Sequence, residues 1–238
     1  MSAVEVKDLV KDFGTVRAVN GVSFGVNEGE VFGLIGPNGA GKTTTMRMMA
    51  TLLQVTSGTI DIFGKDVVSE TDEVRKIISY LPEEAGAYKN LTGRQYLQFI
   101  SRFFAEGKEQ DEMVARGMEV AQLSDRIDDK IDTFSKGMTR RLMVGRALMF
   151  KPRLAILDEL TSGLDVISAQ KIRKVVRDTT RTGTTVIVSS HNMLEVELIC
   201  DRIALVNNGK VVEVGSPADL KSKYDAANIE DVFVKVVG

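Results

Sequence analysis

The sequence has little of several residue types that would indicate particular classes of protein. It contains one cysteine, Cys200, in 238 residues, which excludes an internal disulfide and is typical of a protein from a reducing compartment. No uncharged apolar run approaches the roughly 20 residues of a membrane-spanning helix, and residues 1–10 lack the apolar region of a secretory signal. We therefore expect a soluble protein whose association with a membrane would depend on a partner.

Positive charge is not in excess either. The formal net charge is -2 at pH 7 and the sequence pI is near 5.7, so the chain has no strong basic field to hold a phosphodiester backbone. Nucleic acid is therefore not expected as a partner. The chain has no internal repeat or low-complexity segment, and its length suits one large α/β domain or a core with a subdomain.

A glycine-rich segment follows the apolar run Val31–Ile35 and matches the pattern G-x-x-x-x-G-K-[ST]. Glycines let the backbone take positive φ and approach an anion. A helix is expected to follow over Lys42–Leu53, and its N-terminus adds its positive dipole end. Lys42 supplies a full charge for phosphate oxygens, and Thr43 supplies a hydroxyl for a magnesium ion. We therefore predict a phosphate-binding loop made of Gly36, Pro37, Asn38, Gly39, Ala40, Gly41, Lys42, Thr43 and Thr44.

Three further apolar runs are predicted strands with polar side chains at their carboxyl ends, where α/β sheets bind their ligands. Adjacent carboxylates at such a place either begin a helix through salt bridges or act on magnesium, and a neighbouring phosphate loop favours magnesium. A lone histidine is more often structural, but its position at the same sheet edge favours a functional role. The strands are expected at 77–81, 154–157 and 184–190, followed by Glu83, by Asp158 and Glu159, and by His191.

The N-terminal residues alternate between apolar and polar side chains. Residues 4–9 and 22–26 are therefore predicted to be half-exposed antiparallel strands. Phe13 is expected on the loop between them, where it is either a stacking platform for a purine or a cap on the sheet. Near the C-terminus, 203–206 and 211–214 flank Asn207-Asn208-Gly209-Lys210, which is typical of a hairpin turn.

Residues 85–134 are expected to be helical and are richer in aromatic side chains. Tyr96, Phe99, Ile100 and Phe103 have the spacing of one helix face. This face is either the core of a subdomain or a groove for a partner, rimmed by Tyr88 and Phe104, and the two interpretations are compatible.

Further helices are predicted on either side of residues 154–157. One is expected from Lys136 to about Phe150 with Ser135 as its cap, and another after Asp165 as far as Arg177. Together with the strands, these helices predict an α/β fold.

Taken together, these segments resemble the ATP-binding subunit of an ABC transporter over essentially the whole chain. The resemblance implies that residues 36–44 are the Walker A loop and that Leu154–Asp158 is Walker B, with Asp158 acting on Mg²⁺. It also implies that Glu159 is the general base, that His191 contacts the γ-phosphate, and that Phe13 stacks on adenine.

The fold that the resemblance implies is a P-loop ATPase core with a mixed, mainly parallel sheet. An N-terminal antiparallel β subdomain and an inserted α-helical subdomain are expected with it. The expected division places the core and β subdomain in residues 1–84 and 136–238, and the helical subdomain in residues 85–135.

A second anion site is implied at the family's signature motif, which corresponds to Ser135, Lys136, Gly137 and Met138. A hydroxyl and backbone N–H groups at a helix start suit an anion. In the family this segment binds ATP held by the opposite subunit, so the expected catalytic unit is a head-to-tail dimer of two copies of the chain.

Some residues depart from the usual pattern of the family. Glu83 stands where a glutamine is usual; it keeps an oxygen for the metal or its water but adds negative charge. Lys136 and Met138 replace glycine and glutamine in the signature, and Leu160 replaces a proline. None of these changes removes a group essential to hydrolysis.

Three features are most similar to the subfamily that serves drug, sodium and other exporters: the Glu83-Glu84 pair, the signature variant and the ending at 229–233. The resemblance implies a separately encoded transmembrane permease and a location in the cytoplasm, peripheral to the inner face of the cell membrane. A soluble ABC-type ATPase acting on nucleic acid or ribosomes is the alternative, but such proteins usually have long insertions or two cassettes. A GTP switch protein is less favoured, because no N-K-x-D segment is present.

Overall fold

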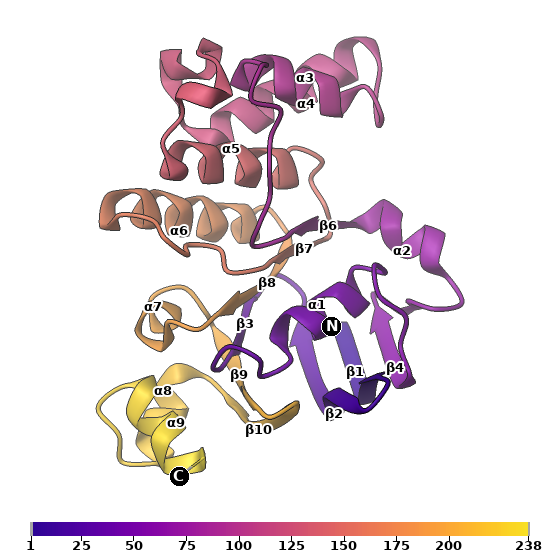
Figure 1. Ribbon diagram of the computed structural model, residues 1–238, viewed down its shortest axis with the longest axis vertical. Helices are drawn as coiled ribbons and strands as arrows, with labels where there is room; N and C mark the ends of the chain where they lie inside the picture. Colours follow the sequence, from indigo (N-terminus) through magenta and orange to yellow (C-terminus); the bar gives the residue numbers. More distant parts are fainter. Residues whose placement is uncertain (1, 238) are drawn as a thin grey trace.

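The structure, a computed structural model, describes residues 2–237 as two sheets with helices around them (Figure 1). The strands are β1 (Ser2–Phe13), β2 (Val16–Asn27), β3 (Val31–Ile35), β4 (Ser57–Ile62), β5 (Lys65–Asp66), β6 (Ile78–Leu81), β7 (Leu154–Leu157), β8 (Thr185–Ser190), β9 (Arg202–Asn207) and β10 (Lys210–Gly215). The helices are α1 (Lys42–Met49), α2 (Thr71–Ile77), α3 (Gly93–Ser101), α4 (Gly107–Ala121), α5 (Lys136–Leu148), α6 (Val166–Arg181), α7 (Met193–Glu197), α8 (Pro217–Lys223) and α9 (Ile229–Val237), with short 3₁₀ turns at Ser124–Asp128 and Ile131–Thr133.

The larger sheet has the strand order β10-β9-β3-β8-β7-β6. Its pairings are parallel except for the β9–β10 hairpin, which turns at Asn208 and Gly209 as expected. Every residue of β3, β7 and β8 is buried, which is why these strands are continuous apolar runs. The predicted mixed, mainly parallel sheet is confirmed.

The smaller sheet is antiparallel, with the order β2-β1-β4-β5. In β2 the burial alternates over Val22–Val26, as predicted for strands with one face toward a core. Phe13 is the last residue of β1 rather than a loop residue, because β1 and β2 pair as far as Phe13 and Val16.

Two helix boundaries differ from the expected ones. The helix after the glycine-rich loop was expected to reach Leu53 but ends at Met49, and Thr51 beyond it has a φ of 59°, which a helix cannot contain. The helix after Asp165 is longer than predicted and continues to Arg181. Sequence periodicity does not reveal either end, because both depend on single backbone conformations.

Helices α3 and α4 lie at one end of the molecule, and α5 packs both on them and on α6 and β6 (Figure 1). The expected aromatic core here is only partly present. Tyr96 is buried, but Phe99 is partly exposed and Phe103 is 69% exposed. The expected i, i+7 spacing does not hold for Phe103, because α3 ends at Ser101.

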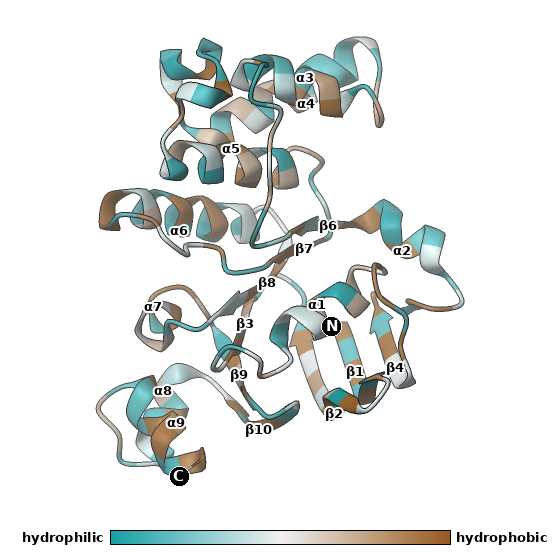
Figure 2. Ribbon diagram, viewed as in Figure 1, coloured by the Kyte–Doolittle hydropathy of each residue, from teal (hydrophilic) through white to brown (hydrophobic). Residues whose placement is uncertain are grey.

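The buried apolar side chains form two clusters, one on each face of the larger sheet. One contains β3, β7 and β8 side chains with those of α5 and α6, and the other contains side chains of α1 and the smaller sheet. Figure 2 shows the hydrophobic strands of the larger sheet running between more hydrophilic helices. Within residues 2–237, no helix is both long and apolar enough to cross a membrane.

Candidate functional site

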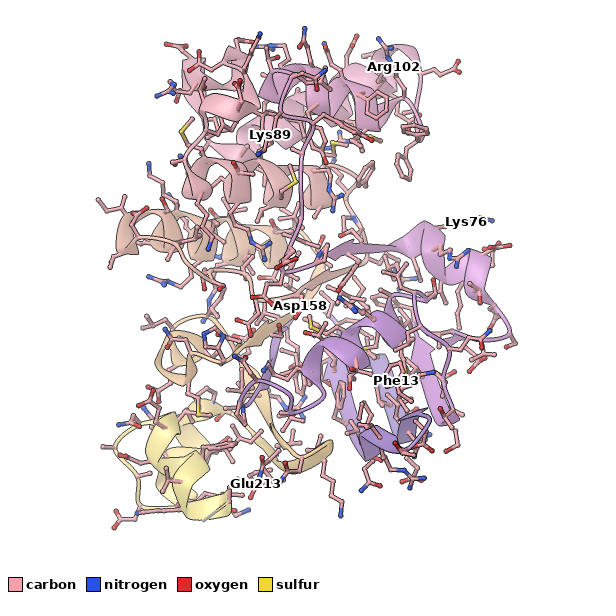
Figure 3. All side chains as sticks on the ribbon, in the orientation of Figure 1. Phe13, Lys76, Lys89, Arg102, Asp158 and Glu213 are labelled. Atoms are coloured by element: carbon pink, nitrogen blue, oxygen red, sulfur yellow. The ribbon has the colours of Figure 1, made fainter. Side chains whose placement is uncertain are left out.

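The strands β3, β8, β7 and β6 are neighbours in the larger sheet and run in the same direction. Their carboxyl ends therefore meet at one edge. The predicted phosphate loop follows β3, His191 follows β8, Asp158 and Glu159 follow β7, and Glu83 follows β6. Figure 3 shows Asp158 near the centre of the molecule, between the helices and the antiparallel sheet.

The glycine-rich loop joins β3 to α1 in a conformation that depends on its glycines. A Cβ on Gly36 would collide with the backbone carbonyl of Val206 in β9, and Gly41 has a φ of 102°. A Cβ there would lie 2.6 Å from the carbonyl oxygen of Ala18. Neither position has room for a side chain. Pro37, Asn38 and Gly39 are exposed, whereas Gly36, Ala40 and Lys42 are buried and Gly41, Thr43 and Thr44 are half-buried.

Lys42 is the first residue of α1, and its side chain folds back into the loop. Its Nζ donates to the carbonyl oxygens of Gly36 at 2.8 Å and Pro37 at 3.1 Å, and lies 3.9 Å from Oε1 of Glu159. The side chain is 6% exposed. Burial lowers the pKa of Lys42, although nearby carboxylates act against the shift. The ammonium group therefore lies in the loop, where an anion would meet it.

Asp158 has its carboxylate held by three hydroxyl groups. Oδ1 accepts from Oγ1 of Thr43 at 3.2 Å and from Oγ of Ser189 at 2.5 Å, and Oδ2 accepts from the Tyr80 hydroxyl at 3.5 Å. Burial and the Asp158 charge raise the pKa of Tyr80, so this hydroxyl keeps its proton. The Thr43 and Asp158 oxygens are the hard ligands that Mg²⁺ prefers, and this ion usually takes few protein ligands together with phosphate oxygens.

Glu159 has an unusual backbone and a buried carboxylate. Its φ of 47° is left-handed, which costs a non-glycine residue about 1 kcal/mol. Its N–H donates to Oγ of Ser189 at 2.8 Å, and its Oε2 lies 2.8 Å from Nδ1 of His191. The side chain is 6% exposed. The carboxylate thus lies between the Lys42 ammonium and the His191 ring.

His191 follows β8 directly, and its side chain is 46% exposed. Through Nδ1 it is hydrogen-bonded to Glu159, which leaves the Nε2 edge of the ring to face a ligand. The sequence expectation that His191 and the carboxylates share one sheet edge therefore agrees with the geometry, and the role of His191 stays a prediction.

Glu83 lies beyond the end of β6 and is exposed. It lines a pocket with Glu84, Lys136, Arg140 and Glu159. Its charge also contributes to the electrostatic environment of Lys42. Glu83 therefore faces the same cavity as Glu159, and a role toward a metal or its water stays a prediction.

Phe13 lies on the smaller sheet, apart from Asp158 in Figure 3. Its ring is 49% exposed, and the ammonium of Lys11 lies 5.0 Å from the ring centroid. About half of the Phe13 side chain is therefore open to solvent. Stacking on a flat ligand and capping of the sheet both fit this position.

The predicted signature residues form the start of α5. Ser135 caps the helix, accepting a hydrogen bond from the N–H of Met138 at 3.2 Å, and Ser135 and Lys136 are exposed. Gly137 is buried against Ser168, and the Lys136 side chain extends over Gly163. Among the described residues, none of the four forms a hydrogen bond with residues 36–44 of the same chain.

Two residues of this region were not predicted from the sequence. Ser189 binds both Asp158 and the N–H of Glu159, and its only sequence signal is a serine at the carboxyl end of an apolar strand. Arg140 is 8% exposed and donates to backbone carbonyls next to the site. A charged residue in an amphipathic helix gives no signal that it is buried.

Similarity to known proteins supports an assignment to a family. Residues 19–162, more than half of the chain, match the family described as ABC transporter. The linearmycin resistance ATP-binding protein LnrL of Bacillus subtilis (strain 168) is 39% identical over 97% of this chain and 75% of its own length. The daunorubicin/doxorubicin resistance ATP-binding protein DrrA of Streptomyces peucetius is 38% identical over 92% of this chain and 67% of its own length.

Solved structures agree with these relatives. One described as the ATP binding subunit of an ABC transporter has a TM-score of 0.87 and 27% identity, and the match covers 99% of this chain and 100% of that one. A dimeric post-hydrolysis ATP-binding cassette bound to ADP and Pi, with a TM-score of 0.79 over 90% of this chain and 98% of that one, is 24% identical and shares the fold. The chain therefore belongs to the ABC transporter family and is an ATP-binding, ATP-hydrolysing subunit of that family.

Proposed function

We propose that two copies of this chain, arranged head to tail, hydrolyse two ATP molecules and thereby drive export through a separately encoded membrane permease. The observation that carries this proposal is the convergence of Lys42, Asp158, Glu159 and His191 at the ends of adjacent strands. This edge of the sheet brings together the predicted phosphate loop, a carboxylate suited to a metal ion and a second, buried carboxylate.

Glu159 is the proposed general base. Its carboxylate is fixed by His191 and lies 3.9 Å from the Lys42 ammonium, so it is held near the place where the loop would present a γ-phosphate. In-line hydrolysis needs a carboxylate or amide that orients the attacking water. Lys42 would neutralise phosphate charge, and the exposed edge of His191 would contact the γ-phosphate.

The residues fit a magnesium ion. Thr43 and Asp158 have their oxygens 3.2 Å apart at the start of α1, and their chemistry suits Mg²⁺ better than a softer metal. Bound Mg²⁺ would neutralise charge that develops on phosphate oxygens. Glu83, exposed in the same cavity, is a candidate ligand of water bound to that ion.

Adenine is proposed to stack on Phe13. The ring is about half exposed at the end of β1, and aromatic rings stack readily on purines. Lys11 lies over the same ring, which leaves the remaining exposed surface for the base.

The position of the signature residues supports the proposed head-to-tail dimer. Ser135, Lys136, Gly137 and Met138 form an N-terminal helix site of the kind that binds phosphate, yet Ser135 and Lys136 face solvent rather than the chain's own phosphate loop. A second copy of the chain would bring its nucleotide to this surface. Each active site would then contain residues from both copies.

We expect ATP turnover per chain to rise with protein concentration and then to level off, because single chains hold incomplete sites. The measurement is phosphate release over a dilution series at saturating ATP and Mg²⁺. Ser135→Arg, at the exposed helix start, should leave ATP binding to a single chain unchanged and abolish this rise. Turnover per chain that is constant across the series would contradict the dimer, and so would full activity of Ser135→Arg.

A surface for the permease is proposed next to α3. The exposed aromatic patch, defined as Tyr88, Phe99, Phe103 and Phe104, contains rings that contact one another edge to face. Phe103 and Phe104 are 69% and 63% exposed. Exposed aromatic clusters mark interaction sites, and this one suits the apolar face of a short helix from a membrane subunit. Motion of α3 and α4 on dimer closure would then move the permease.

Phe103→Ser should retain wild-type ATP turnover but lose the permease, because Phe103 contributes to the patch and not to the sheet edge. The measurement is copurification with the membrane subunit that the wild-type chain retains in a membrane pull-down, together with phosphate release. Val234→Ser, an equally exposed apolar residue on α9, is the control and should copurify normally. Copurification of Phe103→Ser at the control level would contradict the docking surface.

Export and location at the inner face of the membrane are part of the same proposal. Export is supported by relatives named for resistance to linearmycin and to daunorubicin and doxorubicin. The alternative, a non-transport ATPase acting on nucleic acid or ribosomes, is not favoured because the chain is mildly acidic and resembles transporter subunits over nearly its whole length.

A further inference from the structure

Arg140 lies on the first turns of α5, and its buried guanidinium is fully hydrogen-bonded. Nε donates to the carbonyl oxygen of Leu160 at 3.0 Å. Nη1 donates to those of Pro82 at 2.9 Å and Glu83 at 3.0 Å. Nη2 donates to those of Asp158 at 2.6 Å and Glu159 at 2.9 Å. A guanidinium has five N–H donors in a rigid fork, and here each has a backbone acceptor.

All five acceptors belong to segments at the functional edge of the sheet. Pro82 and Glu83 follow β6, and residues 158–160 follow β7. The side chain therefore joins the start of α5, where the signature residues lie, to the backbone that carries Asp158 and Glu159. The five hydrogen bonds of this one side chain all go to residues that directly follow β6 or β7.

The Glu159 peptide needs such support. Its φ is left-handed, and strained conformations of this kind persist only where the surroundings hold them. Ser189 binds the N–H of Glu159 on one side, and Arg140 binds its carbonyl and those of both neighbours on the other. These contacts hold the backbone from which the Glu159 carboxylate extends toward Lys42 and His191.

We propose that Arg140 is a positioning residue for ATP hydrolysis, holding the Glu159 carboxylate in its productive orientation from the signature helix. The inference rests on the proposed role of Glu159 as general base. Arg140 itself touches neither nucleotide nor water in this role. Its geometry matters more than its charge, since a lysine has three donors on a flexible stem and cannot satisfy five fixed carbonyls.

Arg140→Lys should therefore lower kcat by about tenfold or more and change the KM for ATP by less than about twofold, because small displacements of a catalytic group are costly. The matched control is Arg141→Lys. Arg141 is the next residue of α5, but its Nη1 donates to the carbonyl of Gln122 at the end of α4, away from the site. The control should keep kcat within about twofold of wild type.

A double-mutant comparison separates positioning from a general loss of structure. In a Glu159→Gln background, adding Arg140→Lys should cause no further fall in the residual single-turnover rate, because the group being positioned is already gone. If the double variant is slower than Glu159→Gln by the same factor that separates Arg140→Lys from wild type, the proposal is overturned. A wild-type kcat for Arg140→Lys would also overturn it. Thermal unfolding checks that each variant folds.

If Arg140→Lys does not fold, Arg140→Gln gives the same comparison without burying an unpaired charge. Failure of both variants to fold would assign Arg140 a structural role and overturn the proposal. A Glu159→Gln protein with wild-type turnover would instead refute the role of Glu159. Loss of activity in Glu159→Gln with a normal Arg140→Lys would refute only the role of Arg140.

Discussion

Glu159→Gln should lower ATP turnover by at least about 100-fold, the range expected for loss of a general base, while ATP binding stays intact. The amide keeps the size of the side chain and can still accept a hydrogen bond, but it cannot take a proton from water. Because ATP would persist at both sites, the two-copy form should also accumulate. The measurements are phosphate release, binding of a fluorescent ATP analogue, and the apparent mass in solution with ATP and Mg²⁺.

The control for this substitution is Glu106→Gln. Glu106 directly precedes α4 and is exposed, and its side chain makes no capping hydrogen bond. The Glu106→Gln protein should therefore hydrolyse ATP at the wild-type rate. A Glu159→Gln protein that hydrolyses ATP at the wild-type rate would refute the base assignment. Loss of both binding and turnover would instead indicate that the carboxylate is needed to hold the loop.

Lys42→Ala should weaken ATP binding by about 100-fold, or roughly 3 kcal/mol, which corresponds to loss of charge-assisted hydrogen bonds to phosphate. The ammonium group is preplaced in the loop by the carbonyls of Gly36 and Pro37. Alanine leaves neither the charge nor the donors. Titration with a fluorescent ATP analogue measures the effect, and here the affinity itself falls, whereas in Glu159→Gln only turnover falls.

An exposed lysine is the matched control for Lys42. Lys76 in α2 has a side chain that is 67% exposed and pairs with Glu73 one turn away, and Lys76→Ala should bind ATP normally. Unfolding temperatures without nucleotide show whether Lys42→Ala has damaged the loop, since Lys42 also lies near Glu159. A folded Lys42→Ala protein with wild-type affinity would remove Lys42 from the nucleotide site.

Features with a local cause were predictable from the sequence. The buried strands β3, β7 and β8 follow from continuous apolar runs, and the cap of α5 follows from Ser135. Asp158, Glu159 and His191 each follow a predicted strand. Because parallel strands end at the same edge of a sheet, this was enough to expect the three side chains at one edge of the larger sheet. The geometry agrees, and their catalytic roles stay predictions.

Features that depend on tertiary contacts were not predictable. The end of α3 at Ser101 exposes Phe103, although helical spacing placed it with Tyr96 on one face. Ser189 and Arg140 are defined by partners 18 to 58 residues away in the sequence, and several of these partners are backbone carbonyls that no side-chain pattern records. The left-handed backbone of Glu159 has no sequence signal either, because the residue is not a glycine.

The hydrogen bonds from Lys42 to its own loop affect how much of the free energy of nucleotide binding is spent on ordering the loop. Two carbonyl oxygens of the loop accept hydrogen bonds from the Lys42 ammonium, so the loop's own contacts hold its backbone and a nucleotide would lose little affinity to ordering it. More of the favourable free energy of nucleotide contact then remains to draw two chains together. If two chains associate as proposed, a loop held in this way would make nucleotide supply, rather than loop folding, the event that triggers their association.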